Sequence, residues 1–159
     1  MAAPSLKIKI TLAYLAGIIV VGLFLFLPAG TLDYWQAWAY MAIVFVPVFF
    51  AGQYLLKNDP QLLERRMKLK EKEVEQKALV NLSGAVFIIG FLIPGLDRRF
   101  GLSSIPIEFV LAADALVLIG YAWTFLVLKE NSYASRIIEV EKGQTVIATG
   151  PYSVIRHPM

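Results

Sequence analysis

The sequence of 159 residues contains no cysteine and only one histidine. Without cysteine there is no disulfide framework, no thiolate nucleophile and no cysteine-based metal site. A single histidine also argues against a metal centre built from histidines. Charged residues are scarce at 17%, the net charge is +3, and the basic residues gather at the edges of apolar runs. We therefore expect no nucleic-acid partner, because such proteins concentrate basic residues along one face.

Apolar residues are in excess. The hydrophobic fraction is 58% and the mean hydropathy is +0.65, whereas soluble domains are about 45–50% apolar. Four runs are each long enough to span a bilayer, which takes about 20 apolar residues. We predict an all-α integral membrane protein with one membrane domain over residues 1–159. Its four transmembrane helices lie at about 10–30, 34–56, 78–96 and 106–128, and residues 129–159 form a cytosolic C-terminal loop or hairpin segment.

Proline and acidic residues predict the ends of these elements. The first span is expected to end near Pro28, and Asp97 is expected to begin a short loop after the third. Asp59 followed by Pro60 is a typical helix start, with the acid as N-cap and proline at the first helical position. The charged stretch from 57 to 77 predicts a surface helix against lipid headgroups. This helix is either a solvated connector that fixes topology or part of a substrate gate.

Asp114 is an unusual residue within the fourth predicted span. It stands eight residues after Pro106, about 12 Å along the helix, inside a hydrocarbon core of about 30 Å. A carboxyl group at this depth must be neutral, paired or turned toward a wet cavity. We favour a structural hydrogen bond to a neighbouring helix over a role at a cofactor site.

The distribution of basic residues predicts the orientation. Thirteen of the fifteen lysines and arginines fall in the N-terminal tail, the second connector and the C-terminal segment, and only Arg98 and Arg99 lie on the opposite side. Because cytosolic loops carry the excess of basic residues, we expect both termini in the cytosol. The expected location is the cell inner membrane, as an integral multi-pass protein whose partner is the lipid bilayer.

The last ten residues read Gly-Pro-Tyr-Ser-Val-Ile-Arg-His-Pro-Met. Each proline fixes its own φ and disfavours helix at the residue before it, so we expect a stiff, non-helical loop. This pattern closely resembles the signature loop of the membrane methyltransferases that include isoprenylcysteine carboxyl methyltransferase and the phospholipid methyltransferases. In that family the loop helps to hold S-adenosyl-L-methionine.

The resemblance implies a set of site residues in this chain. The expected cofactor-binding residues are Gln144, Thr145, Val146, Ile147, Tyr152, His157, Pro158 and Met159. Arg156 and His157 are the expected catalytic residues. Arg156 would pair with a carboxylate of the cofactor or the acceptor, or else anchor a lipid headgroup. His157 would donate a hydrogen bond to the cofactor or act as a base, or else only cap the loop. Ile137 stands where the family can carry a cofactor-contacting glutamine, so that contact is not expected.

The function implied by the resemblance is methyl transfer from S-adenosylmethionine to a lipophilic, membrane-embedded acceptor, foremost the carboxylate of an isoprenylcysteine or a similar small lipid-like substrate. Family members continue beyond this point with a tyrosine, a helical hairpin and a glutamate pair. We therefore expect a C-terminally truncated member that binds the cofactor weakly and is inactive alone. Two alternatives stay open: a membrane NADPH-dependent reductase of the steroid-reductase type, and a non-catalytic membrane interaction module.

Overall fold

The computed structural model describes residues 4–67, 74–134 and 146–155. The elements are α1 (Pro4–Ala29), α2 (Trp35–Asn58), α3 (Pro60–Arg66), α4 (Val74–Phe100), α5 (Ile107–Glu130) and the 3-10 turn η1 (Gly150–Ser153). Four helices are long and apolar enough to cross a membrane, over Ser5–Ala29, Trp35–Asn58, Ala78–Phe100 and Ile107–Glu130. Over these described residues, the prediction of an all-helical protein with four such helices is confirmed.

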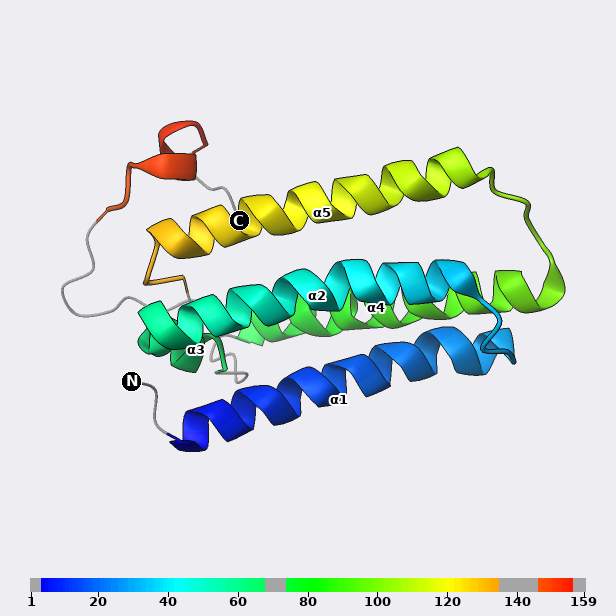
Figure 1. Ribbon diagram of the computed structural model, residues 1–159, viewed down its shortest axis with the longest axis horizontal. Helices are drawn as coiled ribbons and strands as arrows, with labels where there is room; N and C mark the ends of the chain where they lie inside the picture. The colour runs from blue at the N-terminus through cyan, green and yellow to red at the C-terminus, as the bar shows by residue number, and fades with distance from the viewer. Residues whose placement is uncertain (1–3, 68–73, 135–145, 156–159) are drawn as a thin grey trace.

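The four long helices run side by side in alternating directions (Figure 1). α4 packs against α1, α1 against α2, and α2 against α5, while η1 lies on α5 and α3 on α2. The start of α1, the end of α2, α3, the end of α5 and η1 share one end of the bundle, and residues 30–34 and 101–106 occupy the other. The first and last described segments therefore lie at the same end, as the predicted topology requires. The side of a membrane that this end faces stays a prediction.

α1 and α4 approach each other closely at Gly95. A Cβ atom added there would lie 2.6 Å from the carbonyl oxygen of Leu25 and 2.9 Å from Cβ of Pro28. Beside this contact, Leu25, Ala37 and Met41 form a small buried cluster. Large apolar side chains are otherwise widely exposed on the helices. Such a surface suits helices surrounded by lipid, where small residues allow close backbone approach.

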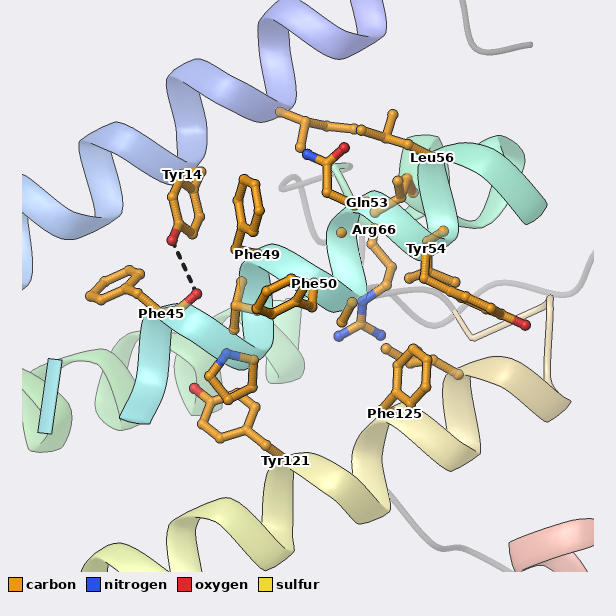
Figure 2. A pocket seen from close by; sticks show the side chains of 18 of the residues that line it. Tyr14, Phe45, Phe49, Phe50, Gln53, Tyr54, Leu56, Arg66, Tyr121 and Phe125 are labelled. Carbon is orange, nitrogen blue, oxygen red and sulfur yellow. Dashed lines mark hydrogen bonds between the residues drawn. The ribbon is translucent and has the colours of Figure 1, made fainter. Parts of the chain in front are cut away.

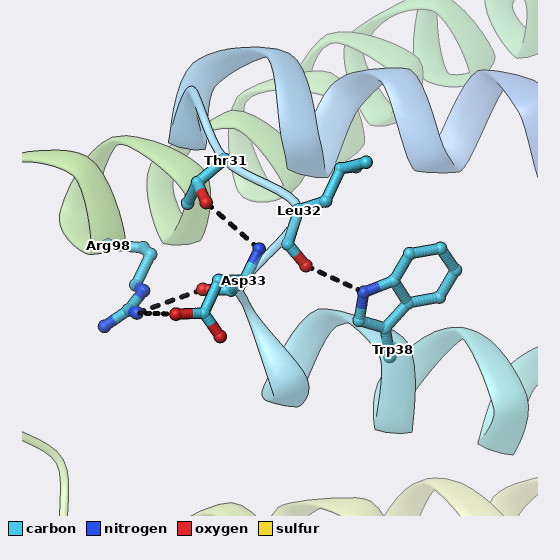
Figure 3. A network of polar contacts seen from close by, with 5 residues as sticks. All are labelled: Thr31, Leu32, Asp33, Trp38 and Arg98. Carbon is cyan, nitrogen blue, oxygen red and sulfur yellow. Dashed lines mark hydrogen bonds and ion pairs between the residues drawn. The ribbon is translucent and has the colours of Figure 1, made fainter.

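Polar contacts connect α4 to the turn between α1 and α2 (Figure 3). Arg98 Nη2 donates to the carbonyl oxygen of Asp33 at 3.0 Å and lies 3.8 Å from its carboxylate. Trp38 Nε1 donates to the Leu32 carbonyl oxygen at 2.9 Å, and Thr31 Oγ1 accepts from the Asp33 amide at 3.0 Å. The turn is therefore closed by its own residues and by one arginine from α4.

Tyr34 belongs to the same end of the bundle. Its hydroxyl donates to the Pro94 carbonyl oxygen at 3.3 Å. Partial burial, and secondly the nearby Asp97 carboxylate, raise the pKa of Tyr34, while Arg98 opposes them. The neutral hydroxyl is therefore the form that the folded chain favours.

The ends of two elements differ from the prediction. α1 ends at Ala29 as expected, with Gly30 in the left-handed region at φ +67°. The expected loop at Asp97 is wrong, because α4 continues to Phe100. Arginines in its last turn suit the negative end of the helix dipole. Gly101, at φ +59°, then ends the helix, and its amide donates to the Asp97 carbonyl oxygen at 2.8 Å.

The predicted surface helix is present only in part. Asp59 is the N-cap of α3, since its Oδ1 accepts from the Leu62 amide at 2.9 Å, and Pro60 opens the helix. α3 has only seven residues, and residues 68–73 lie outside the described part. Leu62 is completely buried, in one cluster with Leu55 and Leu128. α3 is therefore packed onto the end of the bundle, which a helix lying only on headgroups would not be.

Asp114 is half-buried on α5. Its side chain makes no hydrogen bond with any described residue, so the expected bond to a neighbouring helix is absent there. Its carboxylate is within electrostatic range of Tyr40 on α2. The carboxyl group of Asp114 is therefore near a polar side chain of α2, without a direct hydrogen bond to it.

Candidate functional site

The described part of the signature loop is a single helical turn. Pro151 stands in the first turn of η1, and the amides of Tyr152 and Val154 donate to the carbonyl oxygens of Thr149 at 3.1 Å and Pro151 at 3.2 Å. Ser153 Oγ donates to the Gly150 carbonyl oxygen at 2.7 Å. The expectation of a non-helical loop is therefore wrong for residues 150–153, because proline is tolerated at the start of a helix, where its missing N–H has no partner to lose.

The end of α5 holds this turn in place. Asn131 Nδ2 donates to the Tyr152 hydroxyl at 2.6 Å, and Thr149 Oγ1 donates to the Glu130 carboxylate. Gly150 has φ +56°, and a Cβ there would lie 3.1 Å from Cδ of Glu130. Glycine is favoured by the left-handed backbone conformation, and a side chain at this position would also have to shift the Glu130 side chain slightly. The result is a tyrosine ring fixed at the end of an apolar helix.

The segment after α5 is also attached to α3. Arg65 donates to the Ser132 carbonyl oxygen, and Arg66 Nη1 donates to that of Ala134 at 3.4 Å. Ala134 is buried in the cluster of Leu55, Leu62 and Leu128. α3 therefore fixes the chain as it leaves α5 toward the predicted cofactor segment.

Only three of the predicted site residues lie in the described part of the chain. Tyr152 is half-buried, Ile147 is partly exposed, and Val146 is 96% exposed. The residues outside the described part are Gln144, Thr145, Arg156, His157, Pro158 and Met159. Their cofactor-binding and catalytic roles stay predictions. Glu130, which accepts from Thr149, and Asn131, which donates to Tyr152, were not predicted as site residues from the sequence, although two polar residues at the end of a span are a usable signal.

A pocket of about 920 Å³ lies between α1, α2, α3 and α5 (Figure 2). A pocket of this size is in the range that holds small organic ligands. Its walls are mainly aromatic and aliphatic, and include Tyr14, Phe45, Phe49, Phe50, Tyr54, Leu63, Leu118, Tyr121, Phe125 and Leu128. The Tyr14 hydroxyl donates to the Phe45 carbonyl oxygen at 3.0 Å, two residues before Pro47 in α2. This bond ties α1 to the proline-containing part of α2 beside the pocket.

Polar groups on the pocket wall are few. Arg66 reaches in from α3, and its guanidinium lies between Phe50 and Phe125 in Figure 2. Phe125 in turn packs edge-to-face on Tyr54, with ring centroids 5.2 Å apart. Val146, Ile147 and Tyr152, the three described residues of the predicted cofactor site, do not line this pocket. The sequence did not predict it, because its walls come from four elements whose adjacency hydropathy does not encode.

Within the described part of the chain, no group of three or more His, Asp or Glu side chains is arranged to hold a metal ion. The candidate site is therefore made of two neighbouring features: the Tyr152 turn docked on α5, and the aromatic pocket whose wall includes Leu128 near the end of the same helix. Comparison of the chain with protein families, with curated proteins and with solved structures finds no match.

Proposed function

We propose that the protein is a membrane S-adenosylmethionine-dependent methyltransferase of the isoprenylcysteine carboxyl methyltransferase type. Its proposed acceptor is a lipid-linked carboxylate. The observation that carries the proposal is the docking of the signature turn on α5 through the 2.6 Å bond from Asn131 to Tyr152. This places the turn at one end of a bundle of four helices that are apolar enough to span a membrane. The resemblance of residues 150–159 to the family loop supplies the choice of cofactor.

The position of the turn suits this chemistry. S-adenosylmethionine, when bound, supplies an electrophilic methyl group, and a carboxylate is already a nucleophile. The chain then has mainly to align donor and acceptor within about 3–3.5 Å and to exclude water. The ring of Tyr152, fixed by Asn131, fits a cation–π contact with a sulfonium. Arg156 and His157 are proposed to hold the carboxylate and the cofactor, as the resemblance implies.

The proposed location is the cytosolic face of the inner membrane. The end of the bundle that carries η1 also carries the basic residues of α3, Arg65 and Arg66. Basic residues are enriched on the cytosolic side, and this is the side on which S-adenosylmethionine is available. The proposal therefore requires that η1 and α3 face the cytosol together.

Ligand-detected saturation-transfer NMR on the chain in detergent micelles tests the proposal, since it detects the weak binding that we expect. Adenosylhomocysteine should give a transfer signal and NADPH should not. Tyr152→Ala should abolish the signal, whereas Tyr152→Phe, which keeps the aromatic face but loses the hydroxyl bonded by Asn131, should reduce the signal without abolishing it. Val154→Ala is the matched control in the same segment, because Val154 is 77% exposed.

The other outcomes separate the alternatives. A signal from NADPH alone would favour the reductase, and no signal from either ligand would favour the non-catalytic module. Equal adenosylhomocysteine signals from the wild type and Tyr152→Ala would remove Tyr152 from the site.

A further inference from the structure

The carboxylate of Glu130 lies directly beside the signature turn. Glu130 is the last residue of α5, and η1 packs on that helix (Figure 1). Thr149 Oγ1 donates to Oε1 of Glu130. A Cβ atom added to Gly150 would lie 3.1 Å from Cδ and 3.2 Å from Oε2 of the same carboxylate. A negative charge is therefore held beside the backbone two residues before Tyr152.

This negative charge has no cationic partner in the described part of the chain. Oε1 of Glu130 accepts from Thr149, but Oε2 accepts no hydrogen bond from a described residue, and no described basic side chain forms an ion pair with Glu130. Arg65 and Arg66 of α3 donate to backbone carbonyl oxygens that follow α5. The C-terminal end of a helix also carries a partial negative charge. The carboxylate and the end of α5 therefore act together on the turn, opposed in part by the exposed Lys129.

The ring of Tyr152 is oriented by the residue that follows Glu130. Asn131 Nδ2 donates to the Tyr152 hydroxyl at 2.6 Å. One short stretch of chain thus positions an aromatic ring and supplies a negative charge at the same turn. The face of an aromatic ring and a carboxylate both attract a cation, whereas a neutral group gains nothing from either charge. The turn is therefore suited to recognise a positive charge on its ligand.

We infer that Glu130 is a specificity-determining residue that favours the positively charged methyl donor over its neutral demethylated product. The inference rests on the proposed function and adds to it the charge that the site selects. When the methyl group passes to a carboxylate oxygen, the electrons of the broken S–C bond stay on sulfur, and the cationic sulfonium becomes a neutral thioether. The attraction to Glu130 is lost with the methyl group, so the product binds more weakly than the donor and leaves more readily.

Ligand-detected saturation-transfer titrations of the chain in a non-ionic detergent measure the affinity for each ligand. Glu130→Gln keeps an acceptor for Thr149 and removes the charge. It should weaken S-adenosylmethionine binding about two- to fivefold, as expected for an exposed charge, and leave adenosylhomocysteine binding unchanged. Sinefungin, which carries a protonated amine in place of the sulfonium and no transferable methyl group, should respond as S-adenosylmethionine does.

Two controls separate charge from structure. Glu108→Gln makes the same substitution at an exposed position in the first turn of α5, at the opposite end of the bundle, and should bind all three ligands like the wild type. In the wild type, the preference for S-adenosylmethionine over adenosylhomocysteine should shrink as salt is raised from about 0.01 M to about 1 M, because the Debye length falls from about 30 Å to about 3 Å.

Amide hydrogen exchange in residues 150–154 checks that the turn stays docked in Glu130→Gln. Should that variant lose the docked turn, the salt dependence of the wild type decides the outcome. Equal weakening of both ligands with the turn docked, or a wild-type preference that salt does not change, would overturn the inference and leave the proposed donor site standing. Failure of the wild type to bind any of the three ligands would overturn the proposed function, and this inference with it.

Discussion

Replacement of Gly95 by alanine should loosen the contact between α1 and α4. The added Cβ would lie 2.6 Å from the Leu25 carbonyl oxygen, about 0.8 Å less than the 3.4 Å at which ordinary contact begins. The neighbouring Pro28 Cβ and Ala29 N, at 2.9 and 3.2 Å, leave no direction of easy relief. Because the obstructing atoms are mainly backbone, the helices must separate. Overpacking of this kind costs about 1–3 kcal/mol.

Gly90→Ala is the matched control. Gly90 lies on the same helix, and a Cβ there meets nothing within 4 Å. Both substitutions gain the same helix propensity, about 1 kcal/mol in water, so the difference between them isolates the clash. We expect Gly95→Ala to be about 1–3 kcal/mol less stable than Gly90→Ala. Unfolding by SDS in mixed micelles, followed by far-ultraviolet circular dichroism, measures this difference. Equal stability of the two variants would refute the close approach of α1 and α4.

Three further predictions concern single side chains. Tyr152→Phe removes the hydrogen bond from Asn131 and should speed amide hydrogen exchange in residues 150–154 about fivefold, corresponding to about 1 kcal/mol; unchanged exchange would contradict the docking of the turn. Asp59→Ala removes the N-cap carboxylate that accepts from the Leu62 amide, and should lower the free energy of unfolding in SDS by about 1 kcal/mol. Asp59→Asn should stay near the wild-type stability, because asparagine also caps helices. An equal loss of stability in the two variants would contradict the N-cap role of Asp59. The pKa of Tyr34 in the folded chain is raised above its value of 10.0 in the unfolded chain. The neutral Tyr34 hydroxyl therefore stabilises the fold fully below pH 10, and this contribution is lost as the pH rises through the pKa of the folded chain. In SDS unfolding, Tyr34→Phe should therefore lose less stability than the wild type between neutral pH and pH 11. Equal losses in the two proteins would contradict a raised pKa of Tyr34 in the folded chain.

The four long helices were predictable because bilayer thickness and hydropathy set their length. The helix start at Asp59 was predictable for a different reason, since an acidic N-cap followed by proline is a local signal. Both features depend on residues close together in the sequence. The end of α4 was predicted wrongly because Asp97 was read as a break, whereas Gly101 is the residue that ends the helix.

Features that depend on packing between distant segments were not predictable from the sequence. Leu62 is buried against α2 and α5, although it lies in a stretch rich in charged residues, with Asp59 before it and Glu64, Arg65 and Arg66 after it. The pocket requires Tyr14, Arg66 and Phe125 to meet from three different helices, and no local pattern encodes that meeting. The direct partner predicted for Asp114 is absent in the described part, because depth in a span does not specify which facing side chain is near.

Photoaffinity labelling with an azido derivative of S-adenosylmethionine, followed by peptide mapping, tests the central claim most directly. The account predicts that the label attaches to peptides within residues 144–159, including the Tyr152 turn, and that excess adenosylhomocysteine prevents labelling while NADPH does not. Labelling confined to other parts of the chain, or protection by NADPH alone, would contradict a methyl-donor site at this turn.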